Sequence, residues 1–327
     1  MANFDPNIHL AYEAPKRSLT MSDLGLGHLK TLSPIACTDP FPLLTLECVK
    51  ALREEAFSKP VIDNYRREHA LAKCQLRGFA LHAAPFTEAL WTHPETIKMV
   101  SEAAGIDLIP IMPYELGHVN IQAKDGIESL GRDPLPPLPP LVHSDSDTES
   151  SDDETLEVEK VVGWHVDSYP WVCVVMLSDA SSMMGGDTAL EGGDGKVHRV
   201  RGPGIGYAVM LQGKYINHMA CGAWNAAERV TMVTSYRAKD PTLVDDSTLM
   251  TIRPCSDVNE IYYQWATYRV KLLSERFRAK YDQIEKKKAE AGVQAANGFR
   301  DILGKSEFKE WVRDQIKYLQ MTMDEIV

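Results

Sequence analysis

Apolar residues recur at helical spacing through the first third of the chain. The helices that this pattern predicts are residues 42–59, 61–73, 86–93 and 94–105. Pro60 separates the first two because proline interrupts a helix interior, and Gly105 is a typical stop for the last. The first 40 residues are rich in turn-forming and polar residues, which indicates an arm lying over the body of the protein.

Strand patterns begin before the middle of the chain and dominate after it. Residues 75–83 and 115–122 are predicted strands, because apolar residues recur there without helical phase. From about residue 161 to 237, short apolar runs alternate with glycine-rich turns, and no helical stretch lies between them. This pattern is typical of an antiparallel barrel or a double-sheet jelly roll. The helical pattern then returns, with Ser256 or Asp257 as its candidate N-cap.

These elements predict the α+β fold class, with a jelly-roll core flanked by N- and C-terminal helices. Residues 1–130 would form a helical region with the first strands, residues 161–240 the core strands, and residues 241–327 the C-terminal helices. Residues 131–160 are rich in proline and then in serine and acidic residues, and such a segment cannot bury enough apolar surface to order itself. We therefore expect one domain that carries a flexible surface insertion.

Composition narrows the classes of partner. The 327 residues are 44% hydrophobic and 25% charged, with a formal net charge of -11, whereas nucleic-acid binders concentrate basic residues. The start of the chain lacks a secretory pattern, and no apolar run approaches 18 residues. We expect a soluble cytoplasmic protein that binds neither nucleic acid nor membrane. The six scattered cysteines form no CxxC pair and are expected to be free thiols.

Two hydrophilic residues interrupt an otherwise strand-like run, GWHVDSYPW. His165 and Asp167 are two positions apart, so in a strand their side chains point the same way. A third ligand would come from a later strand, and His218 in the run YINHMAC is the candidate. Two histidines and one carboxylate, with coordination positions left open, are the ligand set of non-haem Fe(II) oxygenases.

A basic residue follows the second histidine. Arg229 lies eleven residues beyond His218, and strand alternation places Thr231 on the same face. A guanidinium group binds a carboxylate through two hydrogen bonds, and a neighbouring hydroxyl adds another. The pair is thus a candidate clamp for a dicarboxylate, with Arg237 as a rival on the same face.

From about Gly163 to Tyr236, the chain resembles the Fe(II)/2-oxoglutarate-dependent oxygenase superfamily, and in its spacing the prolyl 4-hydroxylase-like branch. The elements that carry the resemblance, in order, are His165-x-Asp167, Gly185-Gly186-Asp187-Thr188, Pro203-x-x-Gly206, His218 and Arg229. The resemblance implies a double-stranded β-helix core of the cupin type. It also implies that His165, Asp167 and His218 hold iron, and that Arg229 binds the distal carboxylate of 2-oxoglutarate.

The strand before the insertion adds weaker candidates for the pocket. Tyr114, Asn120 and Gln122 would line it, because an early strand contacts the co-substrate in this superfamily. The other histidines, His118 among them, are expected to have no ligand role.

The implied activity is Fe(II)- and 2-oxoglutarate-dependent oxidation of a C–H bond by dioxygen, with release of succinate and CO2. The layout of the chain resembles fungal-type small-molecule oxygenases, so an amino acid or secondary metabolite is the expected substrate. Hydroxylation, desaturation and oxidative cyclisation all stay open. The alternatives are a protein or peptide hydroxylase or demethylase, to which the acidic insertion would attract a basic peptide, and a non-redox metal-binding jelly-roll protein.

Overall fold

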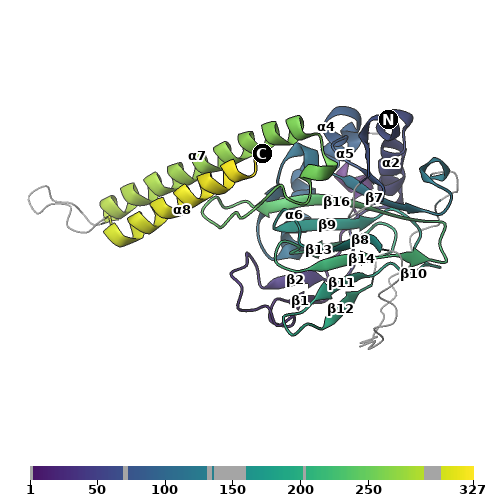
Figure 1. Cartoon of the computed structure of the whole chain (residues 1–327), viewed down its shortest axis with the longest axis horizontal. Coiled ribbons are helices and arrows are strands. Elements are labelled where there is room, and N and C mark those ends of the chain that lie inside the picture. Colours follow the sequence, from purple (N-terminus) through teal and green to yellow (C-terminus); the bar gives the residue numbers. More distant parts are fainter. Residues whose placement is uncertain (1–2, 69–72, 131–134, 136–159, 202–203, 291–302) are drawn as a thin grey trace, which may run out of the picture.

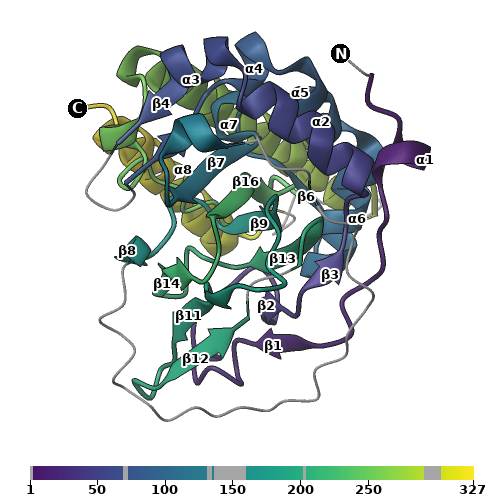
Figure 2. The same ribbon diagram turned by 90° about the vertical axis from the view of Figure 1, so that its right-hand side faces the viewer.

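Two antiparallel sheets form the centre of the molecule (Figure 2). The computed structural model describes residues 3–68, 73–130, 135, 160–201, 204–290 and 303–327. The predicted insertion, residues 131–160, lies outside the described residues except for Leu135 and Lys160, and so does Pro203 of the sequence motif.

The large sheet has ten strands. Its order is β1-β2-β13-β9-β16-β7-β5-β4, with β3 paired to β13 and β6 paired to β16. The strands are β1 (Ser18–Thr20), β2 (Ile35–Thr38), β3 (Phe41–Pro42), β4 (Arg66–Arg67), β5 (Gln75–Leu76), β6 (Leu108–Pro110), β7 (His118–Ala123), β9 (Trp171–Met176), β13 (Tyr207–Leu211) and β16 (Glu228–Ala238).

The small sheet has four strands in the order β12-β11-β14-β8. These are β8 (Lys160–His165), β11 (Thr188–Glu191), β12 (Val197–Val200) and β14 (His218–Cys221), and a separate pair joins β10 (Met184–Gly185) to β15 (Ala223–Trp224). Leu190 and Val200 of the small sheet pack in one apolar cluster with Val209 and Val233 of the large sheet. The two sheets therefore face each other across a shared core.

Alternation along β16 separates the two faces of the large sheet. Val230 and Met232 pack into the main core with the helices, whereas Val233 points to the small sheet. The helices on the outer face are α1 (Pro6–His9), α2 (Leu46–Ala56), α3 (Lys59–Tyr65), α4 (Ala80–Ala83), α5 (Pro85–Thr92) and α6 (Pro94–Ala104) (Figure 2). Short 3-10 turns cover Pro113–Glu115, Ile127–Ser129 and Arg253–Cys255. This helical layer buries the side of the sheet that faces away from the small sheet.

Local signals place the ends of these helices. The Thr45 hydroxyl caps α2 by accepting a hydrogen bond from the Cys48 amide, as an N-cap residue does. Gly105 ends α6 in the left-handed conformation, with φ 67°, which glycine adopts without steric cost. The predicted end of this helix is confirmed.

Three predicted elements were wrong. The first 40 residues are not an arm outside the body, because β1 and β2 join the large sheet. The helix predicted over residues 61–73 ends at Tyr65, where the chain turns into β4 to pair with β5. The strand predicted over residues 75–83 stops at Leu76, and the positive φ of Gly78 then leads into α4.

Two long helices, α7 (Val258–Glu290) and α8 (Lys305–Asp324), form an antiparallel hairpin that projects away from the sheets (Figure 1). The expectation that the C-terminal helices pack on the outside of the sheets holds only near the start of α7. There Ile261 and Trp265 pack against Met112 and Tyr114. No helix among the described residues is both long and apolar enough to cross a bilayer.

The segment between β16 and α7 joins the hairpin to the small sheet. The Thr248 amide donates to the Ser168 carbonyl at 2.8 Å, and the Thr251 amide donates to the Ser168 hydroxyl at 3.1 Å. Glu325, just beyond α8, holds the same segment, because its carboxylate accepts from the Leu249 amide at 2.8 Å and pairs with Arg253 at 2.6 Å.

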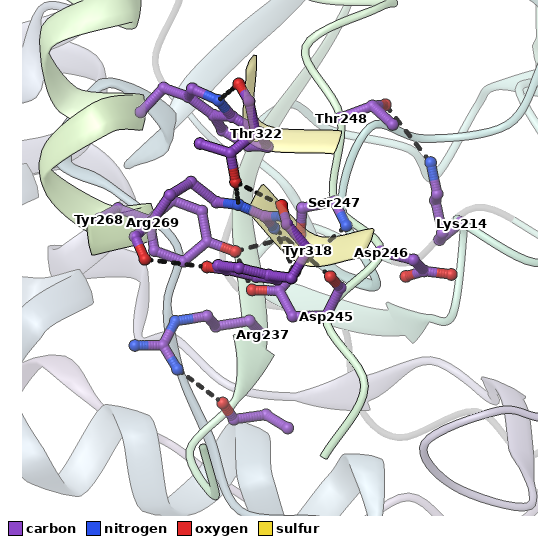
Figure 3. A network of polar contacts seen from close by, with 12 residues as sticks. Lys214, Arg237, Asp245, Asp246, Ser247, Thr248, Tyr268, Arg269, Tyr318 and Thr322 are labelled. Atoms are coloured by element: carbon purple, nitrogen blue, oxygen red, sulfur yellow. Dashed lines mark hydrogen bonds and ion pairs between the residues drawn. The ribbon is translucent and has the colours of Figure 1, made fainter. Parts of the chain in front are cut away.

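Arg269 of α7 is the centre of the polar network at this junction (Figure 3). Its side chain is fully buried, stacks on the Tyr318 ring at 3.5 Å and lies 3.6 Å from the Asp245 carboxylate. It also donates to the Thr322 hydroxyl at 2.9 Å and to the Tyr318 carbonyl at 3.2 Å. One planar cation therefore ties α7, α8 and the connecting segment together.

We expect Arg269→Lys to lower the free energy of unfolding by about 3 kcal/mol, because lysine keeps the charge but loses the fork of buried hydrogen bonds. Arg278→Lys is the matched control, since Arg278 lies on the same helix with an exposed side chain that pairs with Asp282 and lies over the Tyr281 ring. Urea unfolding of both variants measures the difference. Equal losses would contradict the role given to Arg269.

Candidate metal centre

The register of two neighbouring strands brings the predicted ligands together. β14 pairs antiparallel with β8, and His218 lies directly opposite His165. Asp167 follows the end of β8, where its amide donates to the Gly213 carbonyl at 3.0 Å. One donor atom from each of the three ligands lies within 4.8 Å of the others. The residues singled out from the sequence thus form one cluster.

Hydrogen bonds to the backbone orient both imidazole rings. Nδ1 of His165 is 2.7 Å from the Gly163 carbonyl, and Nδ1 of His218 is 2.9 Å from the Ile216 carbonyl. Because a carbonyl only accepts, each Nδ1 carries the proton and each Nε2 keeps its lone pair. The two Nε2 atoms lie 3.4 and 3.7 Å from Asp167 Oδ1. This is the tautomer that a metal ion requires.

The side chain of Asp167 is 17% exposed, and its carboxylate is only partly hydrogen-bonded. Among the described residues, its Oδ2 has no hydrogen-bond partner. Burial acts to raise the pKa of Asp167, but the interactions with His218 and His165 outweigh it, so the pKa is lowered and the group stays charged. Burial lowers the pKa of His218, whereas the influence of Asp167 outweighs burial and raises that of His165. A charged carboxylate oxygen without a donor beside two nitrogen lone pairs fits a divalent cation.

Gly213 leaves the space that Asp167 occupies. A Cβ at this position would overlap Asp167 Oδ2 and would lie 3.0 Å from His218 Cε1. The absence of a side chain here is therefore a condition for the cluster.

A cavity of about 130 Å³ lies between the two sheets and contains the cluster. His165, Asp167 and His218 line it, and Arg229 and Thr231 from β16 also belong to its wall. The candidate ligands and the candidate clamp thus share one space.

Arg229 is almost completely buried, with 4% of its surface exposed. Its Nη2 donates to the Gly186 carbonyl at 3.2 Å, and among the residues that the structure describes no carboxylate lies within ion-pair distance. Its Nε is buried and unpaired. Burial lowers the pKa of Arg229 to about 10, because it outweighs the opposing influence of Cys221 and Asp187. Such a group calls for an anionic ligand.

The other sequence candidates divide between the cavity and the surrounding structure. Asn120 lines the cavity and accepts from Gln75 Nε2 at 2.6 Å. Gln122 lies outside the cavity wall. Its side-chain amide donates to the Ala223 carbonyl and accepts from the Ala223 backbone amide, and it thereby holds β15.

Tyr114 and Arg237 also lie outside the cavity wall. The hydroxyl of Tyr114 accepts from the Asp257 amide at 2.9 Å, and its ring packs with α7. Arg237 continues the face of Arg229, but it stacks on Tyr268 and donates to the Ala238 carbonyl. Between the two rival clamps, the geometry favours Arg229.

Sequence reasoning missed several polar residues of the cavity wall, among them Arg77, Glu115, His118 and Tyr169. His118 was given no role, although its position on the same strand face as Asn120 was a usable signal. Tyr169 was expected to be core packing. Arg77 and Glu115 come from turns outside the motif region, and nothing local in the sequence marks them.

We expect Gly213→Ala to weaken divalent metal binding about 10- to 100-fold, as loss of a ligand's support does, because the new methyl group displaces the Asp167 carboxylate. Gly195→Ala is the control for an added methyl group, since a Cβ there meets nothing within 4 Å, and the backbone strain from its φ of 80° falls in the turn between β11 and β12. Competition titration with Mn(II) measures both affinities. Unchanged affinity in Gly213→Ala would show that Asp167 is not a ligand.

No protein-family model and no curated protein matches this sequence. Among solved structures, a prolyl-4-hydroxylase from Pseudomonas putida is 13% identical over 60% of this chain and 89% of that chain, with a TM-score of 0.36. A 2OG-Fe(II) oxygenase family oxidoreductase from Burkholderia pseudomallei is 14% identical over 58% of this chain and 76% of its own, with a TM-score of 0.36. The non-heme alpha ketoglutarate dependent epimerase SnoN from nogalamycin biosynthesis is 14% identical over 58% of this chain and 73% of its own, with a TM-score of 0.37.

Proposed function

We propose that this chain is a non-haem Fe(II)- and 2-oxoglutarate-dependent oxygenase that oxidises a C–H bond of a small molecule. The observation that carries the proposal is the buried Arg229, which forms no ion pair with the described residues and lines the same cavity as the His165, Asp167 and His218 cluster. On this proposal the two facing sheets are a double-stranded β-helix, and residues 161–240 supply the ligands and the clamp.

The three ligands would hold Fe(II), which supplies the activation of dioxygen that protein side chains cannot perform. His165 and His218 offer Nε2 because their Nδ1 protons are engaged by the backbone. Asp167 contributes the negative charge and its Oδ1, which lies 3.4 and 3.7 Å from the two Nε2 atoms. Three protein ligands leave coordination positions for a keto acid and dioxygen.

Arg229 and Thr231 would hold the far carboxylate of 2-oxoglutarate. A guanidinium group whose Nε is unpaired can bind a carboxylate through two hydrogen bonds, and the Thr231 side chain lies two positions further along the same face. Binding would neutralise the buried charge of Arg229. In the overall reaction, 2-oxoglutarate becomes succinate and CO2 and takes up one oxygen atom, while the second enters the product or leaves as water.

A non-redox metal protein is the alternative from another class. Neither a structural nor a hydrolytic metal site needs a buried cation in its cavity wall that forms no ion pair with the described residues. The oxygenase proposal accounts for both features, which is why we prefer it.

The first test is anaerobic titration of the Fe(II)-loaded protein with 2-oxoglutarate, following the weak visible metal-to-ligand charge-transfer band. We expect the band in the wild type, and we expect Arg229→Gln to need about 100-fold more co-substrate, because a buried charge-assisted hydrogen-bond pair is lost.

Arg237→Gln is the matched control and is expected to titrate like the wild type, since Arg237 bonds Ala238 and Tyr268 outside the cavity. Iron binding without a charge-transfer band would contradict the 2-oxoglutarate assignment and favour the non-redox metal protein. Equal titrations of the two variants would exclude Arg229 as the clamp.

A further inference from the structure

A second charged group lines the cavity, apart from Arg229. Arg77 follows β5, Glu115 lies in the 3-10 turn before β7, and both belong to the cavity wall. Their side chains are 3% and 1% exposed, and Arg77 Nη2 lies 2.5 Å from Glu115 Oε1. His118 and Tyr169 line the cavity with them. We call these four residues the Arg77 cluster.

The Arg77 cluster contains three buried polar atoms without a hydrogen-bond partner among the described residues. They are Arg77 Nε, His118 Nδ1 and the Tyr169 hydroxyl. Each such atom costs about 1–3 kcal/mol when it stays unpaired. Native proteins keep few of them, so three in one cavity wall point to a ligand that pairs with them.

Strand register separates the Arg77 cluster from the clamp. On β16, Arg229 is opposite Gln122 of β7, whereas Val233 is opposite His118. Four residues along a strand correspond to about 13 Å. The cavity therefore has two polar ends, and the metal ligands line the same cavity as the Arg77 cluster.

We infer that the Arg77 cluster binds the ammonium and carboxylate groups of a small aliphatic α-amino acid, which is the substrate class of this site. The inference rests on the proposed function, which takes the cavity as the active site. Arg77 and Glu115 are so close that a ligand with one charge is attracted by one and repelled by the other. A zwitterion, in contrast, is attracted by both.

Apolar side chains supply the rest of the wall. Those from both sheets that would contact an aliphatic side chain are Val162, Val172, Val174, Val209 and Leu211. A cavity that carries the Arg77–Glu115 ion pair at one end, beside an aliphatic lining, suits a molecule with a zwitterionic head and a hydrocarbon tail.

The test is calorimetric titration of the Mn(II)-loaded protein, in the presence and absence of 2-oxoglutarate, with L-alanine, L-valine and L-leucine. Two single-charge analogues of leucine are titrated beside them: 4-methylpentanoate lacks the ammonium group, and 3-methylbutan-1-amine lacks the carboxylate. We expect at least one amino acid to bind, and leucine to bind at least tenfold more tightly than either analogue. Binding of an analogue as tight as that of leucine would overturn the inference, and so would no binding by any of the amino acids.

Tyr169→Phe tests the cluster without removing any bond from the folded protein, because the hydroxyl is unpaired. We expect this variant to keep its thermal stability and to bind the amino acid about tenfold more weakly, as loss of a hydrogen bond to a charged group predicts. Tyr236→Phe is the matched control, since that hydroxyl is also buried and unpaired but lies in the core on the helical side. Equal amino-acid affinity in Tyr169→Phe and the wild type would argue against the cluster as the binding site.

Glu115→Gln tests whether the negative charge of Glu115 binds the ammonium group of the amino acid. Without the charge of Glu115, the ammonium group of leucine would lose its attractive partner, and the carboxylate of either ligand would no longer be repelled. The ratio of the two affinities should therefore shift at least tenfold in favour of 4-methylpentanoate over leucine. An unchanged preference in the folded variant would count against the inference.

The two proposals fail separately in these titrations. If 2-oxoglutarate binds in an Arg229-dependent manner but no amino acid binds, the oxygenase proposal stands and the substrate class is wrong. If an amino acid binds in a Tyr169-dependent manner but 2-oxoglutarate does not, the substrate class stands and the oxygenase proposal falls.

Discussion

The antiparallel pairing of β8 with β14 is the constraint on which the site depends. It places His165 opposite His218, and a slip by one residue would turn one imidazole away from the other, because successive side chains of a strand point to opposite faces. The other neighbour of β14 fixes the same register. On β11, fully buried Leu190 lies opposite His218, and the Glu191 amide donates to the Asn217 carbonyl at 2.9 Å. A slip would therefore also remove Leu190 from the core between the sheets.

Buried polarity in the cavity has an energetic cost that the rest of the fold offsets. Arg229 is desolvated without an acidic partner, and the Arg77–Glu115 pair is almost completely withdrawn from water. The opposite face of the large sheet carries the compensating apolar layer, in which Val230 and Met232 pack with the helices. The two faces of β16 thus have different roles. Residues at odd positions line the cavity and serve binding, whereas residues at even positions pack with the helices and contribute to stability.

Local sequence patterns predicted those features of the fold and site that depend on residues close together in the chain. The strand period predicted that His165 and Asp167 converge, and proline and glycine predicted the bounds of α6. The placing of His218 and Arg229 depended on the order of a family motif. Alternation assigned Arg237 to a strand face but could not say where along that face the cavity ends. The Arg77–Glu115 pair joins two turns 38 residues apart, so its formation follows from tertiary packing that no sequence window contains.

The tie between Ser168 and the segment before α7 has a consequence for the order in which the protein is completed during synthesis. Every proposed metal ligand emerges from the ribosome by residue 218, yet the residue after Asp167 is held by Thr248 and Thr251. That segment is in turn fixed by Glu325, which is synthesised more than 100 residues after His218. Because domains begin to fold from their N-terminal parts during translation, a nascent chain would hold all three ligands before the segment that fixes Ser168 is made. The contacts that fix Ser168, the residue after Asp167, therefore form only once the hairpin of α7 and α8 has been synthesised.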